Sequence, residues 1–165
     1  MRKWCRAVAA LVVAVAASAV PAVTARADGA RPPVQGCNRA WPGRNGNMYA
    51  WADLDCQGTL LGKTAGNDTN WADGAGPFQS SDNDRASSVM NAGTLGGRDV
   101  VAFYLNVGLD FLDGYACLSP NEMFADDLRD NYFLSVPSTR KTLNDNISSH
   151  YWVTKSDCAA GSWIT

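Results

Sequence analysis

Apolar residues of this chain come in short runs, and the residues between the runs are mostly Gly, Asn, Asp and Ser. Short runs rich in β-branched and aromatic residues and bounded by turn formers are typical of β-strands. No stretch keeps the period of about 3.6 residues that marks an amphipathic helix. We predict strands at 48–51, through 60–61, and at 87–91, 100–104, 115–118, 132–136 and 149–154, and one helical turn within 123–130. This pattern favours an all-β sandwich.

One polar pattern occurs twice. The first corner, Asn83-Asp84-Arg85-Ala86-Ser87-Ser88, and the second corner, Asn144-Asp145-Asn146-Ile147-Ser148-Ser149, both follow Asn-Asp-x-small or apolar-Ser-Ser. The second corner begins 61 positions after the first, and a Gly-rich joint at 92–97 lies between them. A repeat of this kind indicates one supersecondary unit built twice, each copy burying the apolar face of the other.

The N-terminal residues have the features of an export signal. Basic residues precede an apolar run at 7–20, and Ala25-Arg26-Ala27 is a small-x-small cleavage motif. We therefore predict a signal peptide at 1–27 rather than a membrane span. Residues 28–36, with two consecutive prolines, are predicted to be a flexible lead-in to a single domain at 37–165. The protein is expected to be secreted.

Charge and cysteine content narrow the classes of function. Without the four basic residues of 1–27, ten Lys and Arg remain against 16 acidic residues. An acidic chain without a basic cluster argues against binding to nucleic acid or anionic membranes. The remaining cysteines are even in number, which in an exported chain predicts two disulfides. Three pairings exist, and the duplication favours one bond in each half: Cys37–Cys56 and Cys117–Cys158.

The hairpin and the corners together resemble a known family. Trp51-Ala52-Asp53-Leu54-Asp55-Cys56-Gln57-Gly58 resembles the βγ-crystallin hairpin signature, aromatic-x-x-x-x-Phe-x-Gly, with Cys56 in the Phe position. Both corners are similar to that fold's Asn/Asp-Asn/Asp-x-x-Ser/Thr-Ser motif, whereas Tyr104 fits the hairpin signature only with a shifted spacing to Gly108 or Gly114. With its cysteines and signal, the chain resembles the streptomycete metalloproteinase-inhibitor family. The resemblance implies a crystallin-like sandwich of two Greek keys, at about 37–95 and 98–158.

The same resemblance implies a calcium site at the corners. Calcium-binding βγ-crystallins take ligands for each ion from both corners, which places five residues near calcium: Asp84, Ser87, Asp145, Asn146 and Ser148. Hard cations such as Ca²⁺ take oxygen ligands of these kinds. Arg85 stands where the second corner has Asn146, and a guanidinium repels a cation, so we expect one weaker site. The alternative is that the Asn, Asp and Ser side chains only shape the turns.

Protease inhibition is the leading function that the resemblance implies. A stiff loop held by a disulfide enters a protease cleft with little loss of entropy. Cys117-Leu118-Ser119-Pro120 has these features, so Cys117 and Leu118 are the expected inhibitory loop against a secreted metalloprotease that favours an apolar residue after the scissile bond. The alternative for Leu118 is a core strand residue, and Met123 and Phe124 are alternative anchors. The rival function is a calcium-binding module with a structural or toxin-like role and no protease target, and a third is a glycan binder.

Catalysis is not expected. His150 is the one histidine, and it follows Ser149 on a predicted strand, where adjacent side chains point to opposite faces. The Asp residues are spaced as turn formers, and no Gly-rich phosphate loop opens a helix. We expect a monomeric binding protein.

Overall fold

The computed structural model describes residues 36–165. The predicted signal peptide and residues 28–35 of the predicted lead-in lie outside this range. The described part begins with a one-turn helix, α1 (Gly36–Ala40), which the sequence pattern did not predict. Within 36–165, no helix is long and apolar enough to cross a membrane.

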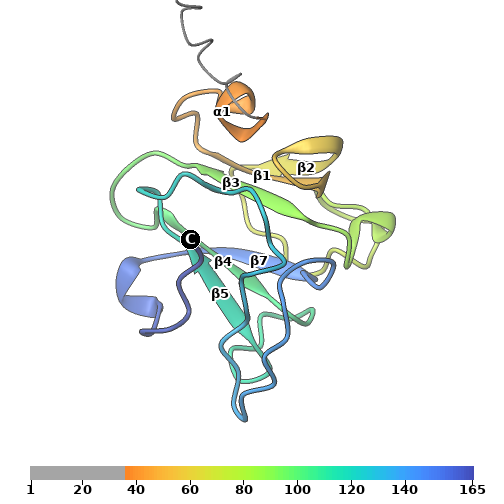
Figure 1. Cartoon of the computed structure of the whole chain (residues 1–165), viewed down its shortest axis with the longest axis vertical. Helices are drawn as coiled ribbons and strands as arrows, with labels where there is room; N and C mark the ends of the chain where they lie inside the picture. The colour runs from red at the N-terminus through yellow and green to blue at the C-terminus, as the bar shows by residue number, and fades with distance from the viewer. Residues whose placement is uncertain (1–35) are drawn as a thin grey trace, which may run out of the picture. The chain divides into compact units, whose positions relative to one another are not determined.

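Four strands form the first sheet, in the spatial order β2-β1-β3-β6. The first three of them are labelled in Figure 1. They are β1 (Asn47–Asp53), β2 (Gln57–Thr64), β3 (Ser88–Ala92) and β6 (Phe124–Ala125), all antiparallel to their neighbours. The β1–β2 hairpin turns through backbone in the left-handed region, and Gly58 has φ 70° there. A Cβ at Gly58 would clash with the Asp53 carboxylate, which explains the glycine of the hairpin signature.

Three strands form the second sheet, in the order β5-β4-β7. They are β4 (Val100–Tyr104), β5 (Tyr115–Leu118) and β7 (Ser149–Val153), again antiparallel. Single 3-10 turns, η1 (Ser80–Asp82) and η2 (Lys155–Asp157), precede β3 and follow β7. Figure 1 shows β4, β5 and β7 as a layer separate from β1, β2 and β3.

The two halves exchange segments. β6 belongs to the second half of the chain but pairs with β3 of the first half, through Val89 with Ala125 and Met90 with Phe124. In return, Asp68 of the first half bridges His150 in β7, with N–H···O distances of 3.2 and 2.8 Å. The predicted fold class, an all-β sandwich of two Greek-key motifs, is therefore confirmed.

The main core lies between the sheets and takes side chains from both. Met48 and Ala50 of β1 face Val101 and Phe103 of β4 across it, as the two-residue period of a strand requires. The alternate residues of these strands are buried as well, because loops and the disulfides cover the outer faces. β1 and β4 are consequently buried on both faces over most of their length.

Both disulfides join residues of the same half. Cys37 in α1 is bonded to Cys56 in the β1–β2 hairpin, and Cys117 in β5 is bonded to Cys158. This is the pairing that the duplication favours. In addition, the Asp55 carboxylate accepts hydrogen bonds from the N–H groups of Gly36 and Cys37, at 2.9 and 3.3 Å, so it caps α1.

Two predictions about secondary structure are wrong. Residues 123–130, predicted to hold a helical turn, contain β6 instead, because Phe124 and Ala125 find partners on β3. Residues 132–136, predicted as a strand, contain no continuous strand. Only isolated bridges form there, from Leu134 to Tyr115 and from Tyr132 to Thr142.

Candidate functional site

The fold brings the two corners together with their contacts crossed. The Ser148 hydroxyl of the second corner donates to Asp84 Oδ1 of the first at 3.1 Å. The Ser87 hydroxyl of the first corner lies 3.5 Å from Asp145 Oδ1 of the second. The backbone repeats this exchange, because the N–H groups of Asp84 and Asp145 donate across to Ile147 and Ala86 carbonyls at 3.1 and 3.0 Å. The corners form one paired site with approximate two-fold symmetry.

The sequence of each corner suits its conformation. Asp84 and Asp145 have φ of 54° and 55°, in the left-handed region that Asn and Asp tolerate better than most residues. The preceding Asn side chains, Asn83 and Asn144, donate to these carboxylates at 2.7 and 2.6 Å. Each Asn thus holds the carboxylate of its neighbour in place.

Each corner also contains a buried oxygen without a hydrogen-bond donor. The atoms are Oδ1 of Asn83 and Oδ1 of Asn144, and neither has a hydrogen-bond partner in the described chain. A buried acceptor without a partner is rare, because it has lost its hydration without compensation. The same atom is unsatisfied at both equivalent positions, so the feature belongs to the motif and not to one irregular turn.

The structure brings four of the five predicted metal residues together at this site, and Asn146 is the exception. Asp84, Ser87, Asp145 and Ser148 meet at the corner pair, as described above, and both Asp side chains are exposed. Asn146 turns back to its own loop, because its amide nitrogen donates to the Asn144 carbonyl. Arg85 is exposed and donates to the Ser81 carbonyl at 3.0 Å, which fixes its guanidinium on η1.

The oxygen set includes two residues that the sequence interpretation missed. Asn83 and Asn144 open their corners in the sequence, but only the folded structure shows that one oxygen of each is buried without a donor. Within 36–165, no three His, Cys, Asp or Glu residues lie close enough together to hold a metal ion. The corner pair instead offers amide, hydroxyl and carboxylate oxygens, which is a donor set that fits a hard cation.

A polar cavity extends from the corners toward the β1–β2 hairpin. Its volume is about 510 Å³, and Ser87 and Asn144 of the two corners line it together with Asp53 and Asp55. Arg129 also lines it and pairs with Asp127 at 2.6 Å on the surface. The guanidinium holds the pKa of the Asp127 carboxyl below its usual range. The cavity therefore connects the corner pair with the surface beside the hairpin.

Cys117 and Leu118, the predicted inhibitory loop, are not in a loop. Both lie in β5 and are 0% exposed. The Cys117 N–H donates to the Ser162 carbonyl at 2.7 Å, and the Cys117 carbonyl accepts the Ile164 N–H at 3.1 Å. The C-terminal segment therefore covers the edge of β5. Leu118 is the core strand residue of the alternative interpretation, and its side chain does not reach a partner at the surface.

A different loop presents apolar side chains. In the β4–β5 connection, Phe111 and Leu112 are 43% and 66% exposed, and Val136 on a neighbouring loop is 73% exposed. The Val136 N–H donates to the Leu112 carbonyl at 2.9 Å and ties the two loops together. Asp110 accepts the Leu112 N–H at 2.9 Å, and the Phe111 ring packs edge-on against Tyr104. This apolar loop pair is held in a defined conformation.

His150 is part of the core. Its Nδ1 accepts the Trp71 indole N–H at 3.0 Å, and its Nε2 lies 3.1 Å from the Gly66 carbonyl, to which it donates. Burial lowers the pKa of His150 to about 4, so the ring is neutral at pH 7. The Ser149 hydroxyl donates to the Asn106 carbonyl at 2.7 Å and not to His150.

Comparison with known proteins gives a likeness of fold only. No family model and no curated protein matches the chain. A solved structure from a study titled "Evolution of the eye lens beta-gamma-crystallin domain fold" matches with a TM-score of 0.43 and 21% identity, covering 67% of this chain and 86% of that one. The N-terminal domain of protein S matches with a TM-score of 0.41 and 21% identity, covering 64% of this chain and 92% of that one.

Proposed function

We propose that this is an exported, disulfide-bonded βγ-crystallin-like module that binds Ca²⁺ at its paired corners. The observation that supports this most directly is the pair of buried, unsatisfied oxygens, Asn83 Oδ1 and Asn144 Oδ1. Cations at the paired corners would supply the positive charge that these two oxygens lack. Two disulfides within the halves are in keeping with an oxidising compartment.

Each ion would take ligands from both corners. Asp84 and Ser148 already lie in contact, as do Asp145 and Ser87, so each carboxylate is paired with a hydroxyl of the other corner. Ca²⁺ binds about 6–8 oxygens in flexible arrangements, and it would draw the remaining ligands from backbone carbonyls and water. Arg85 adds positive charge to the first corner, so we expect the ion beside Asp84 to bind more weakly.

Calcium would act by stabilising the joined halves. A ligand that binds only the folded state at about 100 times its Kd adds about 2.7 kcal/mol to the free energy of unfolding. Because the ligands come from both corners, this stabilisation would oppose separation of the two Greek keys.

Calorimetric titration of the calcium-free protein with Ca²⁺ tests the proposal. We expect binding heat and a rise in Tm for the wild-type protein. Both should fall more in Asp145→Ala than in Asp84→Ala. Asp73→Asn is the matched control, because Asp73 is an exposed turn residue whose hydrogen bond to Ala75 an Asn can keep. Absence of both heat and Tm shift in the wild-type protein would remove calcium binding.

A second function, inhibition of a secreted metalloprotease, is supported by the apolar loop pair. Phe111, Leu112 and Val136 are exposed on loops that are already ordered by the Leu112–Val136 hydrogen bond, so little entropy would be lost on docking. In this proposal Leu112 takes the role that the sequence assigned to Leu118.

Titration of thermolysin with the purified protein tests the second function. We expect inhibition that Leu112→Asp abolishes and that Leu95→Asp, an equally exposed residue in the joint, leaves unchanged. Unchanged protease activity at large molar excess of the wild-type protein would contradict it, whatever the calcium titration gives.

A further inference from the structure

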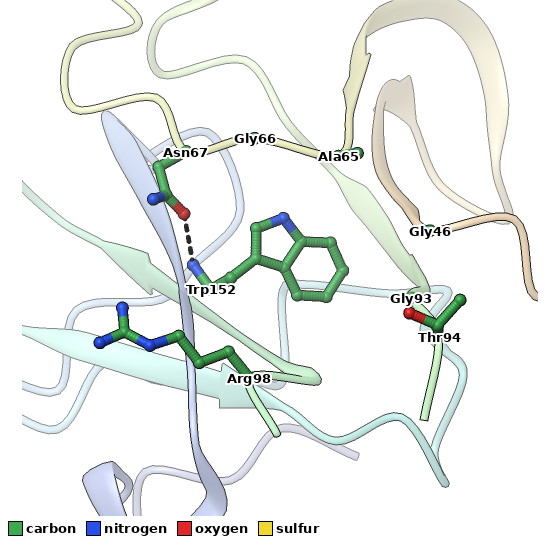
Figure 2. Close-up of a pocket in the computed structure, with 8 residues that line it drawn as sticks. All are labelled: Gly46, Ala65, Gly66, Asn67, Gly93, Thr94, Arg98 and Trp152. Carbon is green, nitrogen blue, oxygen red and sulfur yellow. Dashed lines mark hydrogen bonds between the residues drawn. The ribbon is translucent and has the colours of Figure 1, made fainter. Parts of the chain in front are cut away.

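A cavity outside the corner pair lies where the two halves meet. Its volume is about 390 Å³, within the usual range of small-molecule sites. The Trp152 indole of β7 forms one side, and glycines of the first half and the joint (Gly46, Gly66 and Gly93) form others (Figure 2). A Cβ at Gly93 would lie 2.7 Å from indole carbons, so the Trp152 ring packs directly against the backbone of Gly93.

Trp152, which lines the cavity, has a buried donor without an acceptor. Trp152 is 8% exposed, and its Nε1 has no hydrogen-bond partner among residues 36–165. Figure 2 shows this nitrogen on the edge of the indole that faces the Ala65, Gly66 and Asn67 side of the cavity. The other core indole differs, because Trp71 Nε1 donates to His150. Buried indole N–H groups usually find an acceptor, so this N–H is an exception, and its NMR signal reports on changes at the wall of the cavity.

The polar groups around the cavity are also donors. Asn67 Oδ1 already accepts the Trp152 backbone N–H at 2.8 Å, which leaves the Asn67 amide nitrogen as its free group (Figure 2). Arg98 uses one guanidinium nitrogen on the Tyr151 hydroxyl at 3.3 Å and stacks over that ring, and its remaining N–H groups are available to a ligand. Thr94 adds a hydroxyl at the rim.

The charge around the cavity is opposite to that of the chain. The full chain has 16 acidic residues against 14 basic ones, but Arg98 is the charged residue among those that line the cavity within 36–165. A site with one cation, several hydrogen-bond donors and an aromatic wall complements a ligand that carries a carboxylate and a flat apolar face.

We propose that this cavity binds a small organic carboxylate of about monosaccharide size. The carboxylate accepts from Arg98 and Asn67, and the ring of the ligand lies against Trp152. A uronic acid and an aromatic acid share this chemistry, and the test below separates them. The site uses no atom of the corner pair, so it does not depend on calcium.

The test follows the Trp152 indole N–H by NMR in ¹⁵N-labelled, calcium-free protein with a chelator present. Its signal is identified by its loss in Trp152→Phe. The probes are glucuronate, benzoate and neutral glucose at millimolar concentration. We expect the signal to shift with at least one acid and not with glucose. A response to glucuronate alone assigns a sugar acid, and a response to benzoate alone assigns an aromatic acid. No shift with either acid, or an equal shift with glucose, overturns the proposal.

Variants test the two donors, Asn67 and Arg98, one at a time. Asn67→Asp keeps an oxygen for the Trp152 backbone N–H but replaces the amide donor with a carboxylate, and Arg98→Gln removes the cation. We expect each to weaken acid binding roughly tenfold or more, since both remove a hydrogen bond to a charged group. Arg39→Gln, an exposed arginine in α1, makes the same change of charge and should bind as the wild type does. Equal affinity in all three variants would overturn the proposal, and the wild-type titration decides it if Asn67→Asp does not fold.

Discussion

At the scale of single residues, His150 shows how the fold fixes a protonation state. The ring lies among aromatic side chains, edge-on to Trp71 and Phe78, with centroids at 5.7 and 5.4 Å. One ring nitrogen accepts from Trp71 and the other donates to Gly66, so the neutral form satisfies both neighbours. A second proton on Nδ1 would meet the Trp71 N–H instead of an acceptor. The imidazole is therefore held neutral by geometry as well as by burial.

The protein should lose stability in mild acid because of this residue. Burial lowers the pKa of His150 from 6.5 to about 4, so between these values the unfolded state binds more protons and stability rises with pH. Above about pH 6.5, His150 does not reduce the free energy of unfolding. As the pH falls toward 4, the free energy of unfolding decreases, and the total loss is about 3 kcal/mol. Urea titrations from pH 7.5 to 4.5 should show a steeper loss for the wild type than for His150→Asn. Equal slopes would contradict the assignment.

Gly62 in β2 is a second position where one atom decides stability. A Cβ there would lie 2.7 Å from the Phe78 ring, which is itself stacked on Trp71 with a centroid distance of 3.8 Å. Neither ring can move freely, so Gly62→Ala should lower the free energy of unfolding by about 1–3 kcal/mol. Gly74→Ala is the control, because the space around Gly74 is open. Thermal unfolding of both variants checks the difference, and equal Tm values would show that the core accommodates the methyl group.

At the scale of elements, the strands that form apolar runs between turn residues were predictable from the sequence. The segments that pair with the other half of the chain were not. β1, β4, β5 and β7 form apolar runs between turn residues, which a local pattern detects. β6 has two residues and exists because β3, far away in sequence, pairs with it. Residues 132–136 have strand-like composition but find only isolated partners. Local sequence contains no information about such long-range pairings.

The sequence identified the residues of the candidate site but not how they are arranged. The repeated motif identified the corners, but the crossed pairing of Ser148 with Asp84 depends on how the halves dock. The orientation of Arg85 toward Ser81 depends on η1, which the pattern did not suggest. Leu118 was ambiguous because an apolar residue beside a Cys and a Pro fits both a loop and a strand end.

The two disulfides should differ in their contribution to stability. The bonded residues are 19 apart for Cys37–Cys56 and 41 apart for Cys117–Cys158. The loop-closure model gives about 3 and about 4 kcal/mol for these separations. In addition, Cys117 lies inside β5, whereas Cys37 holds only the short helix α1. Urea titration of Cys117→Ala/Cys158→Ala should therefore show the larger loss relative to Cys37→Ala/Cys56→Ala, and the reverse order would contradict this account.

At the scale of the whole molecule, neither half is complete without the other. The first sheet takes β6 from the second half, and β7 takes the Asp68 bridge from the first. The main core contains residues of both halves. At the corners, the Asp carboxylate of each half lies within hydrogen-bond distance of a Ser hydroxyl of the other half. No disulfide of the described chain crosses the joint, because both bonds lie within a half. The halves are therefore held together by non-covalent contacts and by the joint alone.

Cleavage at the joint should consequently leave a folded complex of two fragments that are unfolded when separated. The joint is accessible, with Leu95 66% exposed, so a protease site placed there can be cut in the folded protein. We expect the nicked protein to keep its near-ultraviolet circular dichroism, because the cut breaks no strand pairing. After separation in denaturant, each fragment alone should lack native signals, since its sheet and its side of the core are incomplete. Mixing the two should restore the native spectrum, and if Ca²⁺ binds at the corners it should tighten the reassociation. A single fragment with a native-like, dispersed NMR spectrum would show that one Greek key folds alone and that the exchange of segments is not required.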